Sequence, residues 1–126
     1  MSLNPQRTYV HLAESGDATQ LPGGEAFWRL PEAALAAYGT GWLISEFEFV
    51  ADWQNWEMHP DADEFVYLLS GSVELHLEQQ DGLRKVALSG SGAILVPRGV
   101  WHTAKVMAPS RMLHVTRGAG TQLRPA

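Results

Sequence analysis

The chain has 126 residues, a length typical of one domain, and it contains no cysteine. The lack of cysteine excludes disulfides, thiol nucleophiles, zinc ribbons and iron–sulfur clusters, so any metal must be held by His, Asp or Glu. The 9 Lys and Arg against 14 Asp and Glu give a net charge of -5, which disfavours nucleic acid as a partner. No basic segment precedes an apolar run at the N-terminus, and no apolar stretch approaches the ~20 residues that span a bilayer. We therefore expect a cytoplasmic protein with no membrane partner.

The first 40 residues are predicted to be an N-terminal arm with one short helix, packed on the rest of the domain. Residues 31–38 (PEAALAAY) favour this helix, because Pro31 suits a first helical turn and Gly39 suits a helix stop. Residues 1–30 and the C-terminal tail, residues 118–126, are predicted to be arms.

Residues 41–117 are predicted to form a barrel of short antiparallel strands, so the fold class is all-β. The 12 glycines and 7 prolines of the chain interrupt it about every ten residues, as in strands that are joined by turns. The expected strands are at residues 42–49, 56–59, 64–69, 72–78, 83–88, 93–96, 103–107 and 111–117.

Two turns are predicted to divide this region into hairpins. Ser70-Gly71 separates two runs rich in Val, Tyr and Leu, and the segment 80–82 (QDG) supplies the φ > 0 residue that a hairpin loop needs. Residues 64–69 are apolar on both faces of their predicted strand, so a second sheet or a second subunit must cover one face. We therefore expect a homodimer.

Three polar side chains near residue 60 are candidates for one site. Glu57 and His59 are two residues apart on a predicted strand, so they project from the same face. Glu64 opens the next strand after a turn that contains Pro60. If the chain folds back at this turn, the three side chains converge as in a metal site with three protein ligands. Glu57 is also a candidate catalytic acid or base, a role that requires only hydrogen-bond reach of a substrate.

A fourth candidate is His102. Pro97 and Gly99 form a predicted tight turn that ends at His102, and His102 then shares the inward face of its strand with Ala104. A neutral imidazole combined with one or two carboxylates suits Zn, Fe, Mn or Ni, and the residue types do not choose among these ions.

The segment 57–71 resembles the first sequence motif of the cupin family, G-x5-H-x-H-x3,4-E-x6-G. His59, Glu64 and Gly71 match the second histidine, the glutamate and the last glycine of that motif. Glu57 stands where the family has its first histidine, which turns a set of three histidines and one glutamate into two histidines and two carboxylates.

The segment 92–106 is similar to the second cupin motif, G-x5-P-x-G-x2-H-x3-N. Pro97, Gly99 and His102 match its proline, second glycine and histidine. Val106 replaces the terminal asparagine, and the opening glycine is one residue closer to Pro97 than in the pattern.

The resemblance implies a cupin double-stranded β-helix, a jelly-roll barrel, with one divalent metal ion inside. The ligand set that it implies is His59, Glu64, His102 and Glu57. Such a protein would act on a small organic molecule as a dioxygenase, isomerase or lyase. Some cupins of sugar-phosphate isomerase type also carry a non-histidine polar residue at the first position and bind metal, whereas others that lose a ligand bind none. The alternative is therefore a metal-free cupin that binds a metabolite as a sensor or binding module.

Other polar and aromatic residues are expected to have ordinary structural roles. His114 is predicted to be a surface or subunit-contact residue, His76 to lie on a wet face between two glutamates, and His11 to lie in the arm. Glu46 and Glu48 are predicted to be surface charges. Aromatic side chains near the candidate site would form a wall for an apolar or planar ligand, and the candidates are Trp42, Trp53, Trp56 and Trp101.

Overall fold

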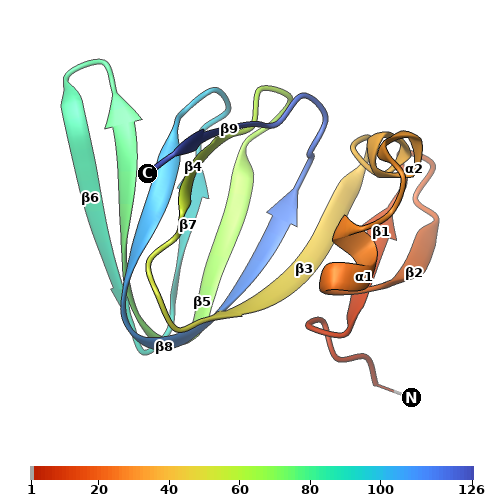
Figure 1. Ribbon diagram of the computed structural model, residues 1–126, viewed down its shortest axis with the longest axis horizontal. Helices are drawn as coiled ribbons and strands as arrows, with labels where there is room; N and C mark the ends of the chain where they lie inside the picture. Colours follow the sequence, from red (N-terminus) through yellow and green to blue (C-terminus); the bar gives the residue numbers. More distant parts are fainter. Residues whose placement is uncertain (1) are drawn as a thin grey trace.

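Two long bent strands organise the fold of the computed structural model, which describes residues 2–126 (Figure 1). They are β5 (Glu64–Gln79) and β8 (His102–Thr116), and they pair antiparallel from Phe65 opposite Val115 to Leu77 opposite His102. Because each strand bends near its middle, its two halves belong to two different sheets. This arrangement confirms the prediction of an all-β jelly roll.

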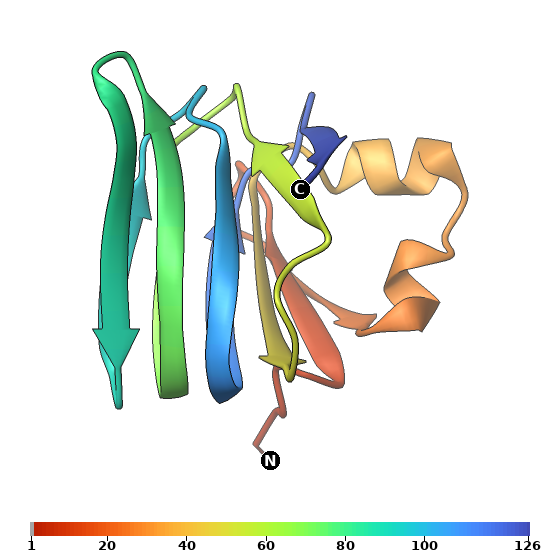
Figure 2. The same cartoon turned by 60° about the vertical axis from the view of Figure 1, so that its left-hand side comes forward.

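The remaining strands extend the two sheets on either side of β5 and β8. One sheet has the order β2-β1-β3-β8-β5-β7, and the other has the order β9-β4-β8-β5-β6. The bounds are β1 Thr8–Leu12, β2 Ala18–Pro22, β3 Trp42–Phe49, β4 Asn55–Met58, β6 Gly82–Ser89, β7 Gly92–Val96 and β9 Gln122–Pro125. Figure 2 shows β6, β5, β8 and β4 side by side in front of the other sheet.

The predicted hairpin at Ser70-Gly71 is wrong, because β5 runs through these residues without reversing. The register with β8 shifts between Leu68 and Val73, which marks bulges at the bend. Gly71 has φ 105°, and a Cβ there would lie 2.3 Å from Ser110 Oγ, so only glycine fits where the two bends cross. The hairpin predicted at residues 80–82 is confirmed, since Gln79 pairs with Gly82 across it.

The register shifts between Leu68 and Val73 also explain the pattern of apolar residues along β5. Buried side chains fall on even positions before it (Val66 and Leu68) and on odd positions after it (Val73, Leu75 and Leu77). From Leu68 opposite Met112 to Val73 opposite Val106, β5 advances five residues and β8 advances six, so the parity that faces the core changes along β5 and both halves bury their aliphatic side chains.

The segments expected to be arms contain regular structure. Residues 8–22 form the β1–β2 hairpin, and β9 in the C-terminal tail pairs with β4 from Asn55 opposite Pro125 to Met58 opposite Gln122. The predicted helix is present as α2 (Glu32–Ala37), and a second one, α1 (Glu25–Trp28), precedes it. Neither of these helices has the length needed to cross a membrane.

Two apolar clusters hold the structure together. The larger one lies between the two sheets and is centred on Leu68, Leu75 and Met112, which are fully buried. The smaller one joins the helices to β1 and β3, with Tyr9 and Phe27 at its centre. Figures 1 and 2 show that α1 and α2 lie beside β3, at the end of the molecule opposite β6.

Candidate metal centre

The four side chains singled out in the sequence come together between the two sheets. Glu57 on β4 is paired directly with His102, the first residue of β8. His59 follows β4, and Glu64 is the first residue of β5 after the intervening turn. The chain thus folds back at this turn, and strand ends from both sheets direct polar groups to one place.

The donor atoms are spaced as the ligands of one ion would be. His59 Nε2 lies 3.6 Å from Glu57 Oε2 and 3.5 Å from Glu64 Oε2. His102 Nε2 lies 3.9 Å from Glu57 Oε2 and 3.2 Å from Glu64 Oε1. Donors at about 2.0–2.2 Å from a shared ion are themselves about 3–4 Å apart. Ligand atoms of Glu57, His59 and His102 all lie within 4.8 Å of one another, which is a possible metal site.

Several of these atoms are buried without a hydrogen-bond partner. They are His59 Nε2, His102 Nε2 and Glu64 Oε1. Leaving such groups unpaired costs on the order of 1–3 kcal/mol each. Because imidazole nitrogens and a carboxylate oxygen are the donors that a divalent ion takes, an ion would satisfy all three atoms at once.

Hydrogen bonds on the far side of each imidazole fix its orientation. His102 Nδ1 lies 3.0 Å from the Val100 carbonyl oxygen, to which it donates, so the Nε2 lone pair faces the carboxylates. His59 Nδ1 lies 2.8 Å from Thr121 Oγ1, a residue of the C-terminal segment. Such partners of the non-ligating nitrogen are typical of metal-binding histidines.

Neighbouring ionisable groups shift the pKa of His59 and of Glu64. Burial lowers the pKa of His59, but the nearby carboxylates of Glu57 and Glu64 outweigh it and raise this pKa to about 9. Burial favours a raised pKa for Glu64, yet His102, His114 and His59 together hold the pKa of Glu64 well below its usual value. Glu64 is therefore ionised across the neutral pH range.

Two residues that sequence reasoning placed elsewhere or passed over belong to this centre. His114 is 6% exposed, and its Nδ1 lies 3.6 Å from Glu64 Oε2, so the prediction of a surface histidine is wrong. Thr116 Oγ1 donates to the same Glu64 oxygen at 2.5 Å. The missed signal was that His114 shares the parity of Met112, which is buried on the inner face of β8.

A cavity of about 700 Å³ opens from this centre toward the helices. Glu57, His59, Glu64 and His114 line its polar end. The rest of the wall comes mainly from β3, the loop after it and the helices, and its aromatic members are Phe27, Trp28, Tyr38, Phe47, Phe49 and Trp53.

The other tryptophans named in the sequence lie away from this cavity. Trp42 stacks under Arg117, whereas Trp56 and Trp101 both flank Arg124. Trp53 does line the cavity, and its ring contacts those of His102 and His114 at centroid distances of 6.3 and 5.8 Å. The predicted aromatic wall is thus supplied largely by residues of β3 and the helices.

Two further expectations, for His76 and Glu46, need correction. His76 is 8% exposed and pairs with Glu74 at 2.7 Å, so it is not on a wet face. Glu46 is 3% exposed and accepts a hydrogen bond from Arg111 at 2.9 Å, so it is not a surface charge. His11 is buried on β1 and contacts the Thr40 carbonyl oxygen, which ties the first strand to the start of the barrel.

Solved structures with the same fold include several cupin proteins. A cupin superfamily protein from Desulfitobacterium hafniense DCB-2 superposes with a TM-score of 0.51 at 21% identity, over 60% of this chain and 65% of that one. An oxalate oxidase superposes with a TM-score of 0.55 at 14% identity, over 64% and 44% of the two chains. Hydroquinone 1,2-dioxygenase PnpCD, in complex with Cd²⁺ and 4-hydroxybenzonitrile, gives a TM-score of 0.52 at 17% identity, over 60% and 56%. The chain spans about half the length of the last two.

A comparison with curated protein sequences finds no significant match. The family described as "Cupin domain" matches residues 48–116, which is more than half of the chain and contains all four candidate ligands. This chain therefore belongs to the cupin family.

Proposed function

We propose that this protein binds one divalent metal ion through His59, His102, Glu64 and Glu57 and oxidises a small organic molecule as a dioxygenase-type enzyme. The observation that carries the proposal is the convergence of unpartnered, buried histidine nitrogens and a carboxylate oxygen at the closed end of an apolar cavity. A metal-free protein would leave His102 Nε2 and Glu64 Oε1 buried without a hydrogen-bond partner.

The composition of the centre favours oxygen chemistry. Two histidines and one carboxylate on one face of an ion, with open positions opposite, are characteristic of non-haem iron oxygenases. His59, His102 and Glu57 supply such a set. When bound, iron or a similar ion would offer those open positions to dioxygen and to a substrate oxygen.

The protein's own residues would position and protect the substrate. Glu64, held ionised by three histidines and by Thr116, keeps a fixed negative charge at the base of the cavity. Glu57 lines the cavity and its side chain is 34% exposed, so it is the member of the set that also reaches a bound molecule. The apolar wall excludes water from the remaining volume.

Two of the structural neighbours are named for oxidative reactions. They are the oxalate oxidase and the hydroquinone dioxygenase, the latter described with Cd²⁺. At 14% and 17% identity they share the fold with this chain. The choice of oxidation therefore depends on the ligand set of this chain.

Elemental analysis of the full chain, purified without a nickel column, tests the metal. We expect nearly one equivalent of Fe or Mn in the native protein and a loss of at least about tenfold in metal affinity in His102→Ala, with the fold preserved. Oxygen consumption with candidate substrates then tests the reaction.

The result decides among the alternatives. A stoichiometric metal without any oxygen uptake would favour an isomerase or lyase. A native protein that remains free of metal after exposure to each of Fe, Mn, Zn and Ni would overturn the proposal and leave a metal-free binding module.

We propose a homodimer as well, from an apolar patch on the outer face of the first sheet. Phe65 and Leu95 are register partners on β5 and β7, and they are 38% and 65% exposed. With Trp42 and Val115 they line a shallow groove. Sedimentation equilibrium should give twice the chain mass for the native protein and a monomer for Phe65→Glu. A native monomer at high concentration would contradict this assignment.

A further inference from the structure

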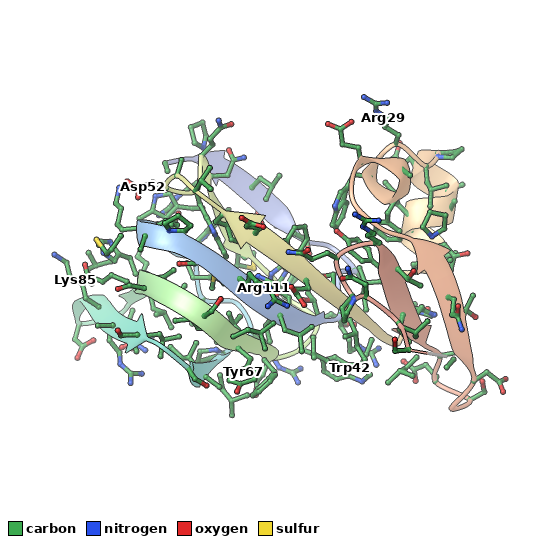
Figure 3. All side chains as sticks on the ribbon, turned by 90° about the horizontal axis from the view of Figure 1, so that it is seen from below. Arg29, Trp42, Asp52, Tyr67, Lys85 and Arg111 are labelled. Carbon is green, nitrogen blue, oxygen red and sulfur yellow. The ribbon has the colours of Figure 1, made fainter. Side chains whose placement is uncertain are left out.

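The charge of the cavity lining is one-sided. Its titratable members other than histidine and tyrosine are Glu48, Asp52, Glu57 and Glu64, and none of the described residues lining it is Lys or Arg. Glu48 is exposed on the face of β3 opposite Phe47 and Phe49, near Arg111, and the exposed Asp52 follows β3. Glu57 and Glu64 belong to the metal centre at the closed end. Figure 3 labels Asp52 beyond the end of β3 that is opposite Trp42.

The cations near Asp52 and Glu48 are already paired with carboxylates. Lys105 Nζ lies 3.8 Å from Asp52, and Arg111 Nε donates to the buried Glu46 at 2.9 Å. Neither Lys105 nor Arg111 lines the cavity. An anionic ligand would therefore find no free cationic side chain in the wall of the cavity.

A bound divalent ion does not reverse this balance. Its two positive charges are matched by Glu57 and Glu64, whereas a centre with three histidines and one glutamate would keep one positive charge. The glutamate at position 57 thus makes the closed end close to neutral, and a carboxylate or phosphate head group would bring an extra, unpaired negative charge.

The wall of the cavity is a continuous band of aromatic rings. Phe47 stacks on Trp28 of α1 at 6.4 Å and on Phe49 at 5.8 Å, measured between ring centroids. Phe49 contacts Trp53 at 5.4 Å, and Trp53 contacts His114 of the polar end at 5.8 Å. The band therefore leads from the helices to the metal centre, and such rings favour offset or edge-to-face contact with another flat ring.

From this charge and this wall we infer that the ligand of the cavity is an uncharged aromatic molecule with one oxygen-bearing head group. Its ring lies against Phe47, Phe49 and Trp53, and its oxygen lies at the end formed by Glu57 and His59. The inference rests on the proposed function for the position of the head group, and it adds that carboxylates and phosphates are selected against.

Four matched probes test the charge and the aromaticity separately. They are 2-naphthylmethanol (neutral), 2-naphthoate (anionic), 2-naphthylmethylamine (cationic) and decahydro-2-naphthylmethanol (neutral and saturated). Calorimetric titration of the full chain, once loaded with metal and once metal-free, gives a dissociation constant for each. We expect 2-naphthylmethanol to bind at least about tenfold more tightly than 2-naphthoate and at least about threefold more tightly than the saturated alcohol.

Two variants assign these preferences to the lining of the cavity. Gln54→Lys, which adds a positive charge to the exposed rim of the cavity, should raise the affinity for 2-naphthoate about three- to tenfold, whereas Gln80→Lys, the same change in the β5–β6 turn outside the cavity, should leave it unchanged. Phe49→Leu should weaken the binding of 2-naphthylmethanol and change the affinity for decahydro-2-naphthylmethanol by no more than about twofold. Because both ligands bind the same variant, this comparison is independent of any general loss of stability.

Each other outcome overturns the inference. Tighter or equal binding of 2-naphthoate removes the charge selection, tighter binding of the amine replaces a neutral ligand by a cationic one, and equal binding of the saturated alcohol removes the aromatic preference. Metal content is measured on the same samples. A chain that takes up no metal but keeps the order of affinities would refute the proposed function and support this inference. A chain that binds metal without this order of affinities would support the proposed function and refute this inference.

Discussion

Glu57 and His102 are register partners on β4 and β8, and Glu57 Oε2 lies 3.9 Å from His102 Nε2. Glu57, which stands in place of the family's first histidine, is thus part of the candidate metal centre and lies on the strand next to His102, the histidine of the second motif. The pairing of β4 with β8 holds the two motifs together even though they are more than 40 residues apart in the sequence.

Glu57→Gln should weaken metal binding by at least about tenfold, because an amide oxygen is a poorer donor than a carboxylate and carries no charge. Glu74→Gln is a matched control. Glu74 also pairs with a histidine, at 2.7 Å, and its side chain is 33% exposed against 34% for Glu57. Competition with a chelator measures both affinities, and equal values for the two variants would show that Glu57 is not a ligand.

Thr116→Val should weaken metal binding about tenfold, because it removes the hydroxyl that donates to Glu64 Oε2 at 2.5 Å. Thr103→Val removes a comparable buried hydroxyl, which donates to the Asn55 carbonyl oxygen at 2.9 Å outside the cluster. We expect Thr103→Val to lower the free energy of unfolding by about 1 kcal/mol without changing metal affinity. A loss of affinity in both variants would point to general destabilisation.

Metal uptake should release close to one proton near neutral pH. The pKa of His59 is raised to about 9 in the metal-free protein, so its imidazole is protonated at pH 7 and must lose that proton to bind an ion. Metal affinity should then rise by about tenfold for each pH unit until about pH 9. Calorimetry in buffers of different ionisation enthalpy counts the protons, and zero release would show that His59 is neutral before binding.

The metal-free protein should be most stable in mildly acidic solution. The folded pKa of His59 is about 9 against an ordinary value of 6.5, so its contribution is complete below pH 6.5 and disappears as the pH rises to about 9. It amounts to on the order of 3 kcal/mol. Glu64, with a lowered pKa, contributes above about pH 4.5 and loses this contribution as the pH falls.

Urea denaturation of metal-free protein from pH 3 to pH 10 measures this profile. His59→Gln should remove the alkaline decline and keep the acidic one, because Glu64 is still paired with His102 and His114. An unchanged alkaline decline in this variant would assign it to another group.

Gly71→Ala should lower the free energy of unfolding by about 2–4 kcal/mol. The added Cβ would face Ser110 Oγ at 2.3 Å and the Pro109 carbonyl oxygen at 2.6 Å, at a φ of 105°. Gly82→Ala is the control, since its φ is 124° but no atom lies within 4 Å of the added Cβ. It should cost only about 1 kcal/mol. Similar losses in thermal or urea unfolding would show that the close crossing of β5 and β8 is not the cause.

The local pattern of the sequence predicted most of the strands, because alternation and turn residues act over a few positions. β3, β6 and β7 lie within one residue of their predicted ranges, and the turn at residues 80–82 is a hairpin. Local pattern could not show that Ser70-Gly71 is a bulge within one strand. A glycine with positive φ serves both structures, and the choice between them depends on the partner strand.

For the candidate site, the spacing of Glu57, His59 and Glu64 around a turn and the position of His102 after Pro97 and Gly99 were sufficient to single out these residues. The sequence alone thereby determined the fold class and the four candidate ligands, since both depend on short-range spacing. Only the tertiary structure brought His114 and Thr116 to Glu64 and placed the rings of β3 and the helices around one cavity. The contacts of Glu64 join residues 50 and 52 positions apart, and the whole arrangement forms only when β3, β5 and β8 pair and the helices pack beside them.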